Sequence, residues 1–236
     1  MGKIRLSLNS FQLKVVAATL MVLDHVRQFI PAMPLWFRYL GRLVAPIFFF
    51  LTVEGFFHTR SRTRHMARLL GAGVIMAIGS GMLTYFFPTT AGLHNNIFFS
   101  LGLGVALMSS CEQLRETDDY FLHMLGILLL VTALLFTEAS IYGVMMILVF
   151  YCFRERKGLL AIFYTIGALL PTLMGPLTLQ QLLLYDYQWM MVFALPLLFL
   201  YNGELGRGGP LAKWFFYVFY PAHLWIIYLI SYRAGF

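Results

Sequence analysis

Charged residues are scarce in this chain. Asp, Glu, Lys and Arg together make up 11% of its 236 residues, whereas hydrophobic residues make up 60%, and the mean hydropathy is +0.78. A soluble globular domain carries about 25% charged residues. The shortage excludes an ordinary soluble protein and predicts an integral membrane protein.

Cysteines and familiar enzyme motifs are also few. Cys111 and Cys152 are the two cysteines, too few for a disulfide framework or a cysteine-based metal site. The sequence contains no glycine-rich phosphate loop, dinucleotide fingerprint, zinc-ligand spacing or Gly-x-Ser-x-Gly elbow. These absences exclude ATP-driven pumps, metalloproteases and serine hydrolases of the usual types.

Long apolar runs are what the chain has instead. A spanning helix needs about 20 apolar residues, and continuous runs favour helices over the alternating strands of a barrel. We therefore expect one integral membrane domain over residues 1–236, an all-α polytopic bundle of about nine spans. The candidate spans are 13–30, 42–57, 67–87, 95–111, 120–137, 139–153, 158–175, 188–202 and 212–232. A short surface or re-entrant helix over 177–187 would make a tenth element.

The positive charges predict the orientation of these spans. If the N-terminus is cytoplasmic, thirteen of the seventeen Lys and Arg residues lie on the cytoplasmic side, as the positive-inside rule requires. The nine spans then place the C-terminus outside a bacterial inner membrane. The thirteen residues are Lys3, Arg5, Lys14, Arg60, Arg62, Arg64, Arg68, Arg115, Arg154, Arg156, Lys157, Arg207 and Lys213.

Asp24 and His25 stand side by side within the first apolar run, and Arg42 opens the second. Ionisable groups inside a membrane are costly and need a partner or a task. The short hinge over 31–41 makes the two helices antiparallel, so the three side chains can meet. A histidine held by a carboxylate suits general-base catalysis. The alternative is that Asp24 forms a structural ion pair with Arg27 or Arg42.

Two further polar groups fall near the predicted helix ends and kinks. His223 follows Tyr220 and Pro221 in the last apolar run, and it either serves the site or satisfies the backbone that the proline loosens. Asn95 and Asn96 open the fourth run. Either can cap that helix, or one can donate a hydrogen bond to a substrate carbonyl.

A cationic segment follows the second apolar run. Glu54 and His58 precede it, and it carries Arg60, Arg62, Arg64 and Arg68. Arginine forks suit phosphate oxygens, so this loop is a candidate cradle for a nucleotide-containing thioester. Anionic lipid headgroups would be attracted equally well, and Glu54 could simply be neutralised by Arg60 or Arg68.

Several short motifs, taken in order, are similar to those of the TraX family of transmembrane acetyltransferases, within the wider acyltransferase-3-like superfamily. They cover nearly the whole chain. They are Met21-Val22-Leu23-Asp24-His25, Gly41-Arg42-Leu43-Val44-Ala45-Pro46-Ile47-Phe48, Glu54-Gly55-Phe56-Phe57-His58-Thr59-Arg60, Asn96-Ile97-Phe98-Phe99-Ser100-Leu101-Gly102-Leu103-Gly104, Tyr142-Gly143-Val144, Asn202-Gly203 and Phe219-Tyr220-Pro221-Ala222-His223-Leu224.

The resemblance implies an enzyme that moves acetyl from cytoplasmic acetyl-CoA to an acceptor outside, such as a pilin or other peptide N-terminus, or a glycan. It implies His25 as catalytic base or acyl relay, Asp24 as its orienting partner and Arg42 as stabiliser of oxyanion charge. Glu54, Asn96 and His223 become pocket residues. The run from Thr137 to Ile141 departs from the polar run that relatives often have there, which leaves the acceptor open.

Two other classes of function fit the same composition. A small proton-coupled transporter would use Asp24, His25 and His223 as a proton relay. A membrane assembly factor would bind a partner without transferring acetyl or moving solute. Acetyl-CoA dependence separates the enzyme from both alternatives.

Overall fold

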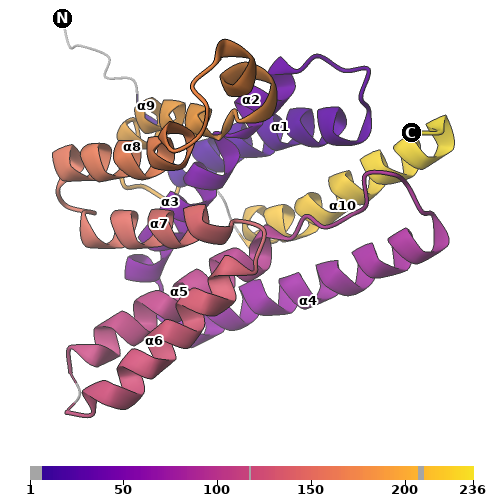
Figure 1. The fold of residues 1–236 in the computed structure, drawn as a ribbon. Helices are drawn as coiled ribbons and strands as arrows, with labels where there is room; N and C mark the ends of the chain where they lie inside the picture. The colour runs from indigo at the N-terminus through magenta and orange to yellow at the C-terminus, as the bar shows by residue number, and fades with distance from the viewer. Residues whose placement is uncertain (1–6, 117, 207–209) are drawn as a thin grey trace, which may run out of the picture. The chain divides into compact units, whose positions relative to one another are not determined.

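The computed structural model describes residues 7–116, 118–206 and 210–236, and in this part the chain is all-helical (Figure 1). Lys3, Arg5 and Arg207, used above to predict orientation, lie outside the described residues. The helices are α1 Ser10–Phe29, α2 Trp36–Gly41, α3 Val44–His58, α4 Arg62–Phe86, α5 Ile97–Leu114, α6 Tyr120–Leu135, α7 Ser140–Cys152, α8 Lys157–Leu173, the π-helix η1 Gln181–Tyr185, the 3-10 helix η2 Gln188–Ala194, α9 Leu195–Phe199 and α10 Pro210–Ala234.

Every apolar run predicted to be a span contains helix, so the all-α prediction is confirmed. The number of spans is not. Within the described residues, four segments are long and apolar enough to cross a membrane: Trp36–His58, Arg62–Phe86, Ile97–Leu114 and Trp214–Ala234. Four others are apolar but shorter, among them α6, α7 and α8.

Two local expectations need correction, whereas the short helix expected over 177–187 is found. The hinge over 31–41 contains the helix α2. The predicted cationic loop from His58 to Arg68 is mostly helix, because α3 ends at His58 and α4 begins at Arg62. The segment 177–187 holds the short π-helix η1 and leads directly into η2.

The chain forms two compact units. The first comprises Met1–Phe48, Phe87–Ala91 and Ala168–Phe236, and the second comprises Phe49–Phe86 and Gly92–Gly167. The expectation of one domain over the whole chain stays a prediction.

In the first unit, α1 packs against α2 and α10. A capping box starts α1: Asn9 accepts from the backbone N–H of Gln12, whose side chain accepts from the N–H of Asn9. The Ser231 hydroxyl of α10 donates to the Phe29 carbonyl at 2.8 Å, and the Phe29 and Tyr228 rings meet edge to face. These contacts fix α1 against α10 one to two helical turns beyond the histidine that each helix carries.

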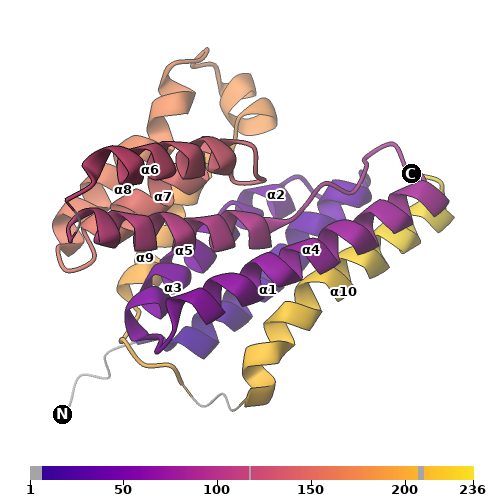
Figure 2. The ribbon, with the colours of Figure 1, turned by 90° about the horizontal axis from the view of Figure 1, so that it is seen from below.

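In the second unit, α5 lies beside α4 and α6, as both views show (Figures 1 and 2). Small residues allow the close approach, as in other membrane helix pairs. A Cβ added to Gly102 would lie 2.6 Å from Leu70 Cδ2, and one added to Gly73 would lie 2.9 Å from Phe99 Cδ1. α5 also packs against α7.

Candidate functional site

Asp24 is held by two arginines. Its Oδ1 accepts from Arg38 Nη1 at 3.1 Å, and its two carboxylate oxygens accept from Arg42 Nη2 at 3.2 and 3.0 Å. Asp24 is 9% exposed, so the ion pairs are largely withdrawn from water. The ion pair between Asp24 and Arg42, considered above as a purely structural alternative, is therefore present. Arg38 joins it, and Arg38 lies one helical turn before Arg42.

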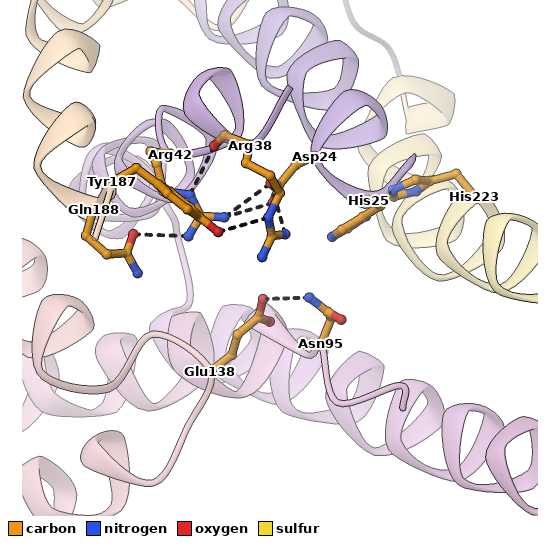
Figure 3. A network of polar contacts seen from close by, with 9 residues as sticks. All are labelled: Asp24, His25, Arg38, Arg42, Asn95, Glu138, Tyr187, Gln188 and His223. Atoms are coloured by element: carbon orange, nitrogen blue, oxygen red, sulfur yellow. Dashed lines mark hydrogen bonds and ion pairs between the residues drawn. The ribbon is translucent and has the colours of Figure 1, made fainter. Parts of the chain in front are cut away.

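The arginines are positioned by the segment around η2. Arg42 Nη1 donates to Gln188 Oε1 at 3.0 Å, and Arg38 Nε donates to the Tyr187 hydroxyl at 3.4 Å (Figure 3). The Arg42 guanidinium also lies 5.5 Å from the Tyr187 ring centroid. All these groups belong to the first unit. The cluster carries two positive charges and one negative, which leaves one excess positive charge.

His25 makes its contact with α10 instead of with Asp24. Its Nδ1 lies 2.8 Å from His223 Nε2, a hydrogen bond between residues 198 positions apart. His25 is 4% and His223 8% exposed. On one helix, neighbouring side chains point in different directions. The expectation that the Asp24 carboxylate orients the His25 ring is thus corrected: the ring is oriented by His223.

The hydrogen bonds assign the tautomers of both rings. His223 Nδ1 lies 2.7 Å from the Phe219 carbonyl, which can only accept, so this Nδ1 carries the proton. In neutral His223, Nε2 then accepts, and His25 Nδ1–H must be the donor. The lone pair of His25 is therefore on Nε2, at the end of the ring that points away from His223 (Figure 3).

His223 makes two contacts, one with the backbone of its own helix and one with the candidate site. Its Nδ1 bonds the backbone of its own helix one turn back, at the Phe219 carbonyl, whereas the carbonyl that Pro221 would loosen is that of Tyr217. The same ring also reaches His25. Tyr220 is buried on this helix, with its ring centroid 6.1 Å from that of His25.

The predicted cofactor residues lie in the second unit. Glu54 is buried and pairs with Arg154 Nε at 2.8 Å and Nη2 at 3.1 Å, so its partner is Arg154, and not Arg60 or Arg68 as considered above. His58 Nδ1 lies 2.7 Å from the Glu54 carbonyl. Arg62 pairs with Glu112 and covers the Phe56 ring. Arg60 and Arg64 are exposed and Arg68 is half-buried.

The two asparagines also lie in the second unit, at Glu138. Asn95 Nδ2 donates to Glu138 Oε1 at 3.3 Å, and the Asn96 backbone N–H donates to Oε2 at 2.6 Å. Asn96 is the N-cap residue of α5 but makes no side-chain cap. The carboxylate of Glu138 caps the helix instead.

Sequence reasoning missed Arg38, Tyr187 and Gln188. Arg38 carried a usable signal, because it precedes Arg42 by four residues and thus shares a helix face with it. Tyr187 and Gln188 lie more than 140 positions from the arginines that they contact, and nothing local marks them.

Comparison with known proteins places the chain in a family. Residues 10–231 match the family described as TraX protein. The chain is also 33% identical over 244 aligned positions to the probable fimbrial assembly protein FimC, serogroup H1, of Dichelobacter nodosus, covering 92% of this chain and 93% of that protein. No solved structure matches the chain significantly. The chain belongs to the TraX family.

Proposed function

We propose that this protein is a membrane acetyltransferase of pilus assembly. It moves acetyl from cytoplasmic acetyl-CoA to an extracytoplasmic acceptor, most simply the N-terminal amine of a fimbrial subunit. The link to fimbriae rests on the fimbrial assembly relative. The acetyl donor rests on the family resemblance of the sequence motifs.

The observation that carries the proposal is the tautomer of His25. A base must present a lone pair toward the group that it deprotonates. The chain of hydrogen bonds from the Phe219 carbonyl through His223 to His25 Nδ1 leaves that lone pair on Nε2. A histidine fixed only for packing would not need a second histidine to select its tautomer.

The reaction then balances with one base. His25 Nε2 takes a proton from the acceptor amine as the nitrogen attacks the thioester carbonyl, and a C–N bond forms. The tetrahedral intermediate collapses with cleavage of the C–S bond, and the proton on Nε2 passes to the leaving thiolate. When His25 becomes positively charged, Nδ1–H continues to donate to His223.

The excess positive charge at Asp24, Arg38 and Arg42 supports stabilisation of the tetrahedral oxyanion. All three nitrogens of the Arg42 guanidinium already have partners, on Arg38, Gln188 and Asp24. Its contribution is therefore better assigned to the electrostatic field of the cluster than to a new direct hydrogen bond.

The cationic residues at the start of α4 are the proposed site for the CoA phosphates. Arg60 and Arg64 are exposed and remain available to an anion, whereas the Arg62 charge is shared with Glu112. We therefore expect Arg60 and Arg64 to matter more for acetyl-CoA binding than Arg62.

The test is acetyl transfer from labelled acetyl-CoA by purified protein in detergent. A peptide with the N-terminal sequence of a fimbrial subunit serves as acceptor, and a glycan and an N-terminally blocked peptide are run in parallel. His25→Ala should abolish transfer, whereas His123→Ala, on exposed α6, should not. Full turnover by a folded His25→Ala protein would refute the proposed base.

A histidine pair inside a membrane protein also fits a proton relay. Proteoliposomes under a pH gradient distinguish the two functions. An acetyltransferase releases CoA without proton flux, whereas a transporter carries protons whether or not acetyl-CoA is present.

A further inference from the structure

The second unit contains a cavity of about 980 Å³ that the proposed reaction does not use. It lies between α4, the segment before α5 and the residues that follow α6. Its walls are mainly apolar and include Leu70, Val74, Leu103 and Phe136. Ligand pockets in proteins commonly have volumes of roughly 300 to 1,000 Å³, so this one is large enough for a molecule.

Part of the cavity lining is polar and includes two acceptor groups, on Glu138 and Asn96. Glu138 lines this part of the cavity. It accepts from the Asn95 side chain, as Figure 3 shows, and from the Asn96 backbone N–H. Asn96 Nδ2 donates to the Gly73 carbonyl at 2.8 Å. Because that carbonyl can only accept, the amide cannot be turned over. Asn96 Oδ1 is therefore fixed as an acceptor, and it is buried with no partner among the described residues.

The one formal charge among the lining residues that the structure describes is negative. Of the sixteen residues that line the cavity in the described structure, one is a carboxylate and none is Lys or Arg. A ligand whose head carries N–H donors and a positive charge would complement both Glu138 and Asn96.

Exposed apolar side chains also line the cavity. Val74 is 49%, Tyr85 81% and Phe136 85% exposed, and all three line the cavity. Helix α4 is one of the four segments able to span a membrane, and only 22% of its apolar window is buried within the protein. Around such a helix the solvent is the hydrocarbon of the bilayer, so lipid chains have direct access.

We propose that this cavity is a binding site for a membrane phospholipid with an ammonium headgroup, of the phosphatidylethanolamine type. The ammonium lies at Glu138, and an acyl chain lies along Val74, Leu103 and Phe136. Capping of α5 explains why Glu138 faces the Asn96 N–H. It does not explain the cavity or the unsatisfied Asn96 oxygen.

The test is native mass spectrometry of the full-length protein. Delipidated protein is reloaded with an equal mixture of phosphatidylethanolamine and phosphatidylglycerol that have the same acyl chains. The wild type should retain the ethanolamine lipid about tenfold over the glycerol lipid, the value of one charge-assisted hydrogen bond of about 1.4 kcal/mol. Glu138→Gln should bring the ratio close to one, and Glu116→Gln, at an exposed acid in the same unit, should not change it.

A second variant tests the cavity without changing its polar residues. Gly81 lines the cavity, and a Cβ there would meet no described atom within 4 Å. Gly81→Leu should fill the space and reduce the lipid retained at least fivefold. Gly71→Leu, on the same helix and equally open but outside the lining, should not.

Three outcomes would overturn the proposal. The first is the same lipid ratio in wild type and Glu138→Gln. The second is equal lipid retention by Gly81→Leu and Gly71→Leu. The third is a co-purified apolar peptide with a free N-terminus in the site in place of any lipid.

Discussion

At the scale of single residues, His223 decides which nitrogen of His25 is basic. The Phe219 carbonyl fixes one end of the two-ring chain and leaves the lone pair at the other. In the proposed reaction His223 would therefore be a positioning residue, which acts through His25. Its removal should affect the chemical step more than substrate binding.

We predict that His223→Leu lowers kcat about tenfold, since it removes one orienting hydrogen bond of about 1.4 kcal/mol. The KM for acetyl-CoA should stay within twofold. His223→Gln should recover part of the rate, because its side-chain oxygen can still accept from His25 Nδ1–H. Steady-state acetyl-transfer kinetics measure both constants. If Gln restores nothing, or KM and kcat change together, the positioning role is wrong.

Gly41 packs directly against the Asp24 side chain. A Cβ at this position would lie 2.3 Å from Asp24 Cγ, a distance that requires the carboxylate or α2 to shift. We predict that Gly41→Ala destabilises the protein by about 1–3 kcal/mol. Thermal unfolding in detergent measures the change. Gly126→Ala, where the added Cβ meets no described atom within 4 Å, is the control and should unfold no earlier than the wild type. Equal melting temperatures for the two variants would contradict the packing described.

Site residues can be predicted from the sequence when the residues that they contact lie nearby in the chain, and not when those residues lie far away. Asp24, His25 and Arg42 are ionisable groups in apolar surroundings, and their rarity alone marks them. The pairing of His25 with His223 spans 198 positions and depends on α1 meeting α10, which no local pattern encodes. Asp24 and His25 are neighbours in sequence, and that proximity favoured a contact which helical geometry does not allow.

At the scale of elements, a buried ion pair joins α3 to the end of α7. Glu54 is 7% exposed, and Arg154 is its partner at two nitrogens. The Arg154 guanidinium also lies 4.7 Å from the Phe57 ring centroid. Loss of the arginine would leave a carboxylate buried without its counter-charge, which costs more than the pair contributes.

Arg154→Ala should therefore destabilise the protein by about 2 kcal/mol, measured by thermal unfolding. Arg156→Ala, at an exposed position two residues on, should change stability by no more than about 0.5 kcal/mol. Adding Glu54→Gln to Arg154→Ala should recover part of the loss, because no charge is then stranded. A double variant as unstable as the sum of both single variants would show that the pair is not coupled.

Apolar runs located the long helices well because length and hydropathy are local properties. The short helix α2 and the start of α4 were not predicted, for a physical reason. Helix α2 has six residues, too few to be stable in isolation, and it depends on packing against α1. Helix α4 begins within a cationic sequence that reads as a loop, where Arg62 is stabilised by Glu112 and the Phe56 ring.

At the scale of the whole molecule, the number of crossings sets where each end of the chain lies. Four segments of the described chain are long enough to span by themselves, whereas the positive charges fit nine crossings with a cytoplasmic N-terminus. The loop between α5 and α6 offers an internal test of this orientation, because it carries Arg115, one of the positive charges predicted to be cytoplasmic. It should be cytoplasmic, and the C-terminus should be outside.

We predict that alkaline phosphatase fused after Phe236 is active and that green fluorescent protein fused there is dark, because the first folds only outside the inner membrane and the second only inside. Fusions truncated after Glu116 should show the reverse pattern. The two sites are separated by five of the nine predicted crossings, an odd number, so opposite signals are required.

Matching signals at both sites would mean an even number of crossings between them. One of the short helices α6, α7 and α8, or the η2–α9 segment, would then lie within the membrane without crossing it, and the acceptor of the proposed reaction would have to be sought on a different side.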